Sequence, residues 1–130
     1  MTNVYIRKKP LLEKDEEIVR VEDVNTITIT KDYDAYDGRK KIKILKYNFD
    51  GIFNCNTNNE YIYDKIIKNN LNDNFTCFMY GQTGSGKTHT VLGTKNDDGI
   101  FVKIGQYLLS TNNEIFLSAY QIYNEELKDV

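Results

Sequence analysis

The first half of the chain alternates apolar and polar residues with a period of two. The run Val4–Ile6 is apolar and is followed by Pro10, which lacks a backbone N–H donor and fixes an exit turn. Isoleucine alternates with threonine over Thr26–Thr30, and apolar residues alternate with lysines over Lys41–Phe49. Asp32–Gly38 between them has the residues of a turn. The pattern predicts one short strand and then a small antiparallel β-sheet with one face in water.

The second half has helical spacing on both sides of one continuous apolar run. Thr57–Glu60 matches a capping box, which predicts a helix start at Thr57, and Asn69 and Asn70 should end that helix. Phe75–Tyr80 is apolar or aromatic at every position but Thr76, which predicts a strand buried on both faces. The next helix should start after the following glycines. The other apolar positions that support these elements are Ile62, Ile66, Ile67 and Leu71 in the first helix; Ile100, Phe101, Ile104, Leu108 and Leu109 in a helix that resumes after a break at Gly93–Gly99; and Ile115, Leu117, Ala119, Tyr120 and Ile122 in a strand within Glu114–Tyr123.

A glycine-rich segment between the predicted buried strand and the next helix matches the pattern G-x-x-x-x-G-K-[ST] at every required position. Its residues are Gly81, Gln82, Thr83, Gly84, Ser85, Gly86, Lys87 and Thr88. Glycines let backbone N–H groups converge on phosphate oxygens, and the N-terminus of the following helix adds partial positive charge. The Lys87 ammonium should neutralise β- and γ-phosphate oxygens, and the Thr88 hydroxyl should bind Mg²⁺. The sequence therefore predicts a nucleoside triphosphate site, with ATP as ligand and Mg²⁺ as the metal.

Composition and charge exclude several other classes of protein. The net charge of -2 over 130 residues provides no general attraction to nucleic acid, and the basic cluster within Arg39–Lys46 is interpreted as a solvated strand face. Cys55 and Cys77 lack the spacing of a disulfide framework or a zinc site, which favours a reducing compartment. No apolar run reaches the length of a membrane span. We expect a soluble cytoplasmic protein without nucleic-acid or membrane partners.

A longer string around the glycine-rich segment, Phe78–Thr90, closely resembles the nucleotide loop of kinesins. Three other stretches are similar to kinesin motifs in the correct order: Val4–Leu11 to the first strand and the R-x-R-P motif, Tyr47–Phe53 to the F-x-F-D-x-V-F region, and Ala119–Leu127 to the S-x-x-E-I-Y-N-E strand. The resemblance implies an α/β fold of the P-loop NTPase class: a partial kinesin motor domain with a central, mostly parallel sheet flanked by helices and a small antiparallel β lobe. Residues 1–130 would be its N-terminal part, without the family's two switch motifs or its main microtubule-binding elements.

The resemblance also implies an adenine site. The matching positions are Arg7, Pro10, Tyr80 and His89, which offer a guanidinium plane and several rings to a flat base. Lys9 stands where the family has a second arginine, and it keeps the charge without the planar fork. Two rival interpretations remain open: His89 as a helix-surface residue without a ligand, and Tyr80 as packing at a strand end.

For function, the resemblance implies the ATP-binding segment of a cytoskeletal motor, which in a complete protein couples ATP hydrolysis to movement along microtubules or to their depolymerisation. Arg7–Leu11 and the helix restart at Gly99 and Ile100 are similar to the microtubule-depolymerising kinesins. We expect this chain alone to bind ATP weakly and to hydrolyse it negligibly. The alternative is a non-catalytic, truncated kinesin-like interaction protein that associates with a complementary chain. An unrelated P-loop NTPase is a third hypothesis, which a preference for GTP would support.

Overall fold

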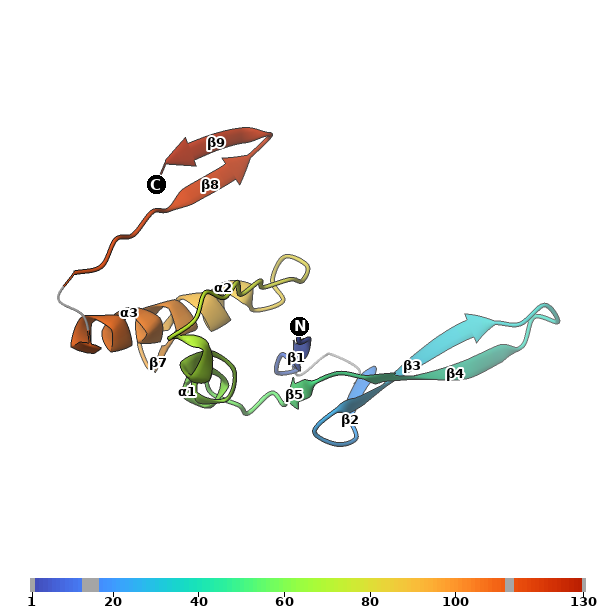
Figure 1. Ribbon diagram of the computed structural model, residues 1–130. Coiled ribbons are helices and arrows are strands. Elements are labelled where there is room, and N and C mark those ends of the chain that lie inside the picture. Colours follow the sequence, from blue (N-terminus) through green and yellow to red (C-terminus); the bar gives the residue numbers. More distant parts are fainter. Residues whose placement is uncertain (1, 13–16, 112–113, 130) are drawn as a thin grey trace.

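The computed structural model describes residues 2–12, 17–111 and 114–129. The elements, in chain order, are β1 (Tyr5–Arg7), β2 (Val19–Val21), β3 (Thr26–Asp34), β4 (Lys40–Asn48), β5 (Gly51–Phe53), α1 (Asn59–Ile62), the π-helix η1 (Tyr63–Ile67), the 3₁₀-helix η2 (Lys68–Asn70), α2 (Lys87–Val91), β6 (Gly93–Thr94), β7 (Asp97–Asp98), α3 (Ile100–Thr111), β8 (Tyr120–Tyr123) and β9 (Glu126–Asp129). Figure 1 shows a body built from β1, β5 and the helices, from which the β3–β4 and β8–β9 hairpins extend in different directions.

The predicted first strand is present as β1, and it pairs in parallel with β5. The register runs from Tyr5 opposite Gly51 to Arg7 opposite Phe53, and the Lys8 amide continues the ladder with a 2.8 Å hydrogen bond to the Phe53 carbonyl. The Tyr5 ring lies over Gly51, where an added Cβ would come within 3.0 Å of the ring, so glycine leaves room for this cross-strand contact. The pairing places Arg7 at the carboxyl end of a parallel strand.

The predicted antiparallel lobe is confirmed as the sheet β2–β3–β4. Strands β3 and β4 pair along all nine residues of each, and β4 is exposed along nearly its whole length, as expected for a solvated lysine-bearing strand. The turn is shorter than predicted, because Asp32–Asp34 continues β3 and Asp34 lies opposite Lys40, a favourable cross-strand pair of opposite charges. Strand β2 was not predicted, since its three residues are too few to show a period.

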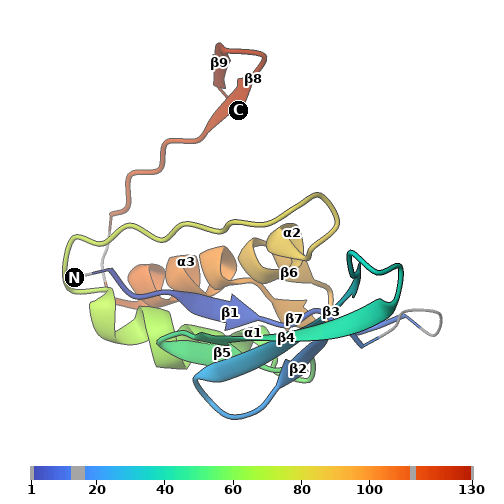
Figure 2. The same ribbon diagram turned by 90° about the vertical axis from the view of Figure 1, so that its right-hand side faces the viewer.

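The hydrophobic core lies between the β1–β5 sheet and the two longer helical segments. Figure 2 shows α1 and α3 together behind β1 and β5, so the helices cover one face of this sheet and do not flank it. Ile62 and Ile67 are buried as predicted, whereas Phe101 and Leu109 of α3 are exposed to solvent. The buried core residues are Phe53, Ile62, Tyr63, Ile67 and Ile100, with Tyr5, Ile66, Leu71, Met79 and Ile104 packed against them.

The N-cap of the first helix lies one residue later than the capping box predicts. Asn58 is the N-cap, and its side-chain oxygen accepts a 3.0 Å hydrogen bond from the Tyr61 amide. The Glu60 carboxylate does not reach back toward Thr57, because it forms an ion pair with Lys103 of α3. A full positive charge is a stronger partner for a carboxylate than a backbone N–H. The capping box is therefore wrong in detail, although the helix ends at Asn70 as predicted.

The predicted buried strand Phe75–Tyr80 is wrong. This segment is irregular and surface-exposed, with Phe78 82% and Tyr80 91% exposed, and their rings stack at a centroid distance of 6.4 Å. A buried strand needs hydrogen-bonded neighbours on both sides, and none of the described strands pairs with this segment. The segment runs as coil from η2 to the glycine-rich loop (Figure 2). Among the described residues, parallel pairing is limited to β1 and β5.

The last predicted strand forms only in its final four residues. Tyr120–Tyr123 pairs with Glu126–Asp129 across a turn at Asn124 and Glu125, whose φ values of 49° and 64° are those that two-residue hairpin turns require. Asn124 and Glu125 thus form an exposed turn. Both views place this hairpin apart from the body of the molecule (Figures 1 and 2).

Two general expectations about the chain concern its cysteines and membranes. Cys55 and Cys77 are both free, and Cys77 is exposed. None of the helices in the described ranges is long and apolar enough to cross a membrane.

Candidate functional site

The glycine-rich loop directly precedes helix α2, as predicted, although a coil replaces the strand before it. Gly84 and Gly86 have φ values of +77° and +98°, which glycine adopts without strain. A Cβ at either glycine would meet no heavy atom within 4 Å, so the space beside the loop is open. The Ser85 amide donates a 3.1 Å hydrogen bond to the Gln82 carbonyl and closes a tight turn. The backbone is thus accessible to a bulky anion.

Two lysine ammonium groups contact this loop. Lys87 donates hydrogen bonds to the carbonyls of Gly81, at 2.7 Å, and Gln82, at 2.8 Å. Lys9 donates to the Gly84 carbonyl from the opposite end of the sequence, at 3.0 Å. A polyphosphate would offer these ammonium groups charged oxygens, which are stronger acceptors than carbonyl oxygens. Two positively charged side chains, Lys9 and Lys87, therefore lie beside the open backbone of the loop.

The residues present fit Mg²⁺ held mainly through phosphate. Thr88, the predicted metal ligand, is exposed in the first turn of α2. The described ranges contain no group of three His, Cys, Asp or Glu side chains that could hold a metal by themselves. Mg²⁺ keeps several waters and takes few protein ligands when it binds with a nucleotide, so a single hydroxyl beside a phosphate loop suits it.

A cavity of about 420 Å³ lies beside the loop. It contains three of the four predicted adenine contacts, Arg7, Pro10 and His89, next to Ser85 and Gly86 of the loop. The fourth contact, Tyr80, is not part of the lining. The complete lining is Arg7, Lys8, Lys9, Pro10, Cys55, Asn56, Thr57, Asn58, Ser85, Gly86, His89 and Asp97.

Arg7 is held in the cavity wall by three acceptors. Its guanidinium donates to the Asn59 side-chain oxygen at 2.5 Å, to the Thr90 hydroxyl at 2.8 Å and to the Thr57 carbonyl at 2.9 Å. Partial burial lowers the pKa of Arg7 below its ordinary value, and the nearby Asp97 carboxylate opposes that shift. Arginine stays charged, so the cavity wall carries a fixed, oriented cation.

Three residues at this wall were not predicted from the sequence: Asn59 and Thr90, which hydrogen-bond Arg7 without lining the cavity, and Asp97, which lines it. From the sequence, Asn59 was only part of a predicted helix start, and Thr90 was only the last residue of the string that resembles the kinesin nucleotide loop. Asp97 was only part of the predicted break between two helices. The sequence signal that could have found them is weak: Thr90 is a polar residue beside the apolar Val91, and Asn59 and Asp97 lie among other polar residues. Their sequence separations from Arg7, 52 residues for Asn59 and 83 for Thr90, leave no local pattern.

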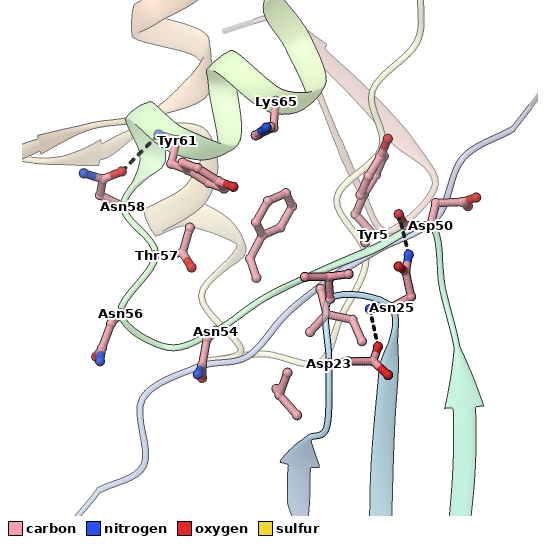
Figure 3. Close-up of a pocket in the computed structure, with 15 residues that line it drawn as sticks. Tyr5, Asp23, Asn25, Asp50, Asn54, Asn56, Thr57, Asn58, Tyr61 and Lys65 are labelled. Carbon is pink, nitrogen blue, oxygen red and sulfur yellow. Dashed lines mark hydrogen bonds between the residues drawn. The ribbon is translucent and has the colours of Figure 1, made fainter.

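A second cavity, more open and about 790 Å³ in volume, lies between the β lobe and α1 (Figure 3). None of the predicted site residues lines it. Figure 3 shows that its polar groups pair with one another: the Asp23 carboxylate accepts from the Asn25 amide, and the Asn25 side chain donates to the Asp50 carbonyl. Lys65 lies 5.6 Å from the centre of the Tyr61 ring. The smaller cavity therefore has the stronger chemical case, because it adjoins the loop and its cations.

Together, the glycine-rich loop, its lysines and the adjoining cavity make a candidate nucleotide-binding site of the P-loop type. Comparison with known proteins identifies the family: the kinesin motor domain model matches residues 7–130, and the chain belongs to this family.

Individual relatives agree with this assignment. Kinesin-like protein KIN-8B of Arabidopsis thaliana is 34% identical, over 98% of this chain and 18% of its own length. Human kinesin-like protein KIF24 is 31% identical over 98% of this chain and 11% of its own length. The kinesin heavy chain of Caenorhabditis elegans is 35% identical over 65% of this chain and 12% of its own length. The chain thus spans less than a fifth of the length of these relatives.

Proposed function

We propose that this chain is the ATP-binding segment of a kinesin-like microtubule motor, which in a complete motor couples ATP hydrolysis to microtubule-based movement or depolymerisation. The observation that carries the proposal is the open glycine-rich loop, with the Lys87 ammonium hydrogen-bonded to its carbonyls and a cavity beside it. Membership of the kinesin family supports ATP over other triphosphates.

Each part of the nucleotide has a proposed contact. The triphosphate would lie along Gly81–Gly86, with Lys87 exchanging its carbonyl partners for β- and γ-phosphate oxygens and Thr88 as the protein ligand of Mg²⁺. Bound Mg²⁺ would neutralise the phosphate charge. The adenine would occupy the cavity at Arg7, Pro10 and His89; its volume of about 420 Å³ is within the range of small-molecule sites. A contact from Tyr80 stays a prediction, because its exposed ring stacks on Phe78.

The partners follow from the family. We propose microtubules as the polymer partner of the complete motor and a cytoplasmic, cytoskeletal location. The depolymerising subfamily stays a prediction from the sequence. Association with a complementary chain is also proposed, because apolar side chains are exposed in the coil before the glycine-rich loop and in the segment from Phe116 to Leu127. Those side chains are Phe78, Tyr80, Phe116, Leu117, Ile122 and Leu127. The non-catalytic alternative would use the same surfaces but would need no nucleotide.

Calorimetry with Mg²⁺ and ATP tests the site. The Lys87→Ala variant should lose at least about 100-fold in affinity, because a charge-assisted contact with phosphate is removed from a partly buried position. Lys43→Ala is the matched control, since Lys43 is an exposed lysine on β4 away from the loop, and it should bind as the unmodified chain does. Equal affinity in the Lys87→Ala variant, or no binding by folded unmodified chain, would contradict the proposal.

ATP turnover tests whether this chain hydrolyses the nucleotide by itself. ATP hydrolysis by this chain should be negligible with or without microtubules, because the chain lacks the family's switch motifs. Microtubule-stimulated turnover by this chain would show that those motifs are not essential. A preference for GTP over ATP in the same binding assay would contradict the proposal of ATP as the nucleotide.

A further inference from the structure

Asn59 is a polar residue with none of its surface exposed. It is the first residue of α1, a position where most side chains point to solvent, and the N-cap role belongs to its neighbour Asn58. A buried amide side chain must find partners for an oxygen and two N–H groups, or it destabilises the fold. Where those partners lie shows what the residue connects.

The partners of Asn59 come from three other elements. Its side-chain N–H group donates to the His89 carbonyl of α2 at 3.0 Å, and its side-chain oxygen accepts from Arg7 of β1 at 2.5 Å. Its backbone amide donates to both carboxylate oxygens of Asp97 in β7, at 3.1 and 3.2 Å. One residue therefore joins the first strand, the helix that follows the glycine-rich loop, and the short β6–β7 hairpin.

The connection continues to the loop itself. Arg7 also donates to the Thr90 hydroxyl at 2.8 Å, and that hydroxyl donates to the Gly86 carbonyl at 3.1 Å. Three successive hydrogen bonds thus lead from Asn59 through Arg7 and Thr90 to the last glycine of the loop. Thr90 is itself buried, so water does not compete freely for these groups.

We propose that Asn59 is a positioning residue of the nucleotide site, which sets the plane of the Arg7 guanidinium against the base and ties the β6–β7 hairpin to α2. This inference rests on the proposed function. Guanidinium donors all lie in one plane, so the Asn59, Thr90 and Thr57 oxygens orient that plane and leave its faces available for a flat ring. Asn59 itself would not touch the nucleotide.

Calorimetry with two ligands separates positioning from general damage. Asn59→Ala should raise the Kd of Mg²⁺-ATP about tenfold, the effect of releasing a charged group from one good hydrogen bond. The Kd of Mg²⁺-tripolyphosphate, which has no base, should change by less than about twofold. Asn70→Ala is the control: it removes an exposed Asn side chain that donates to a carbonyl at the far end of the same helical stretch, and it should alter neither Kd. Equal losses for both ligands would overturn the positioning role.

A second variant keeps the shape of the side chain but removes its polar groups. Leucine has nearly the shape of asparagine, yet it offers no acceptor to Arg7 and no donor to the His89 carbonyl. Asn59→Leu should therefore show the same selective loss: about tenfold in the Kd of Mg²⁺-ATP and less than about twofold in that of Mg²⁺-tripolyphosphate. If Asn59→Ala fails to fold, Asn59→Leu decides, and equal losses for the two ligands would overturn the inference.

Amide hydrogen exchange measured without nucleotide keeps the two proposals distinguishable. The Thr90 amide should exchange at least about tenfold faster in Asn59→Ala, because α2 loses the anchor at the His89 carbonyl. An unchanged rate would refute the coupling even if ATP binds. Failure of the unmodified chain to bind ATP or tripolyphosphate, with Thr90 exchange accelerated, would refute the proposed function and leave the coupling of α1 to α2 in place.

Discussion

Replacing Gly93 with alanine should disrupt the β6–β7 hairpin. Gly93 has a φ of +83°, a left-handed conformation that costs alanine about 1 kcal/mol. A Cβ there would lie 2.2 Å from the Gly99 amide nitrogen and 2.3 Å from the Asp97 carbonyl oxygen. Both are backbone atoms, so no side chain can rotate away to relieve the contact.

These distances set the size of the expected loss of unfolding free energy. Ordinary contact begins at 3.4 Å, so the facing backbone must move by more than 1 Å, the difference between 3.4 and 2.2 Å. That shift would break the 3.2 Å hydrogen bond from the Gly99 amide to the Leu92 carbonyl and loosen the pairing of β6 with β7, at about 1 kcal/mol for each hydrogen bond lost. With the backbone strain, the expected loss of unfolding free energy is roughly 3–4 kcal/mol.

Urea unfolding followed by circular dichroism measures this loss. Gly105→Ala is the matched control, because Gly105 lies within α3 and a Cβ there would meet no heavy atom within 4 Å. Alanine inside a helix should stabilise the protein by about 0.5–1 kcal/mol. The same chemical change should thus have opposite signs at the two glycines. A Gly93→Ala variant within about 1 kcal/mol of the unmodified chain would refute the reasoning from backbone contacts.

Three further changes test the core, the exposed coil and an ion pair. Ile67→Ala should lower the unfolding free energy by about 3 kcal/mol in urea titrations, because Ile67 is 1% exposed within the core; a loss below about 1 kcal/mol would contradict its placement. Phe78→Ser should change the same quantity by less than about 0.5 kcal/mol, since the ring is exposed, and a loss of several kcal/mol would instead favour the buried strand. The hydrogen bond with Glu60 raises the pKa of Lys103 above its ordinary value of 10.5. The pair therefore stabilises the fold fully below pH 10.5, and its contribution falls as the pH rises through the raised pKa. In thermal unfolding, the difference in Tm between Glu60→Gln and the unmodified chain should therefore shrink above pH 10.5. A Tm difference that is independent of pH would show that the ion pair does not cause it.

Local patterns were sufficient for the elements whose stabilising contacts are close in sequence. The β3–β4 hairpin follows from alternation on both sides of a turn, because its strands pair with their neighbour in the chain. The glycine-rich loop, the start of α2 at Lys87 and the restart of α3 at Ile100 follow from glycine positions and helical spacing. Three of the four predicted adenine contacts line one cavity, although whether they bind a base is a prediction.

The errors occur where a distant partner decides the outcome. Phe75–Tyr80 has the composition of a buried strand, yet a strand forms only when neighbouring backbones accept and donate its hydrogen bonds, and no described strand does so. Glu60 has the spacing of a cap, but Lys103, 43 residues later in the chain, is the stronger partner.

Read alone, the sequence was enough for the glycine-rich loop, the β3–β4 hairpin and the resemblance to kinesins, because each depends on residues a few positions apart. The polar cluster of Arg7, Asn59, Thr90 and Asp97 exists only in the folded chain, since its members are far apart in sequence and no local pattern predicts the hydrogen bonds between them. Hydrogen bonds between buried polar groups are short-ranged and directional, so only the packing of β1, α1, α2 and β7 against one another could bring these groups together.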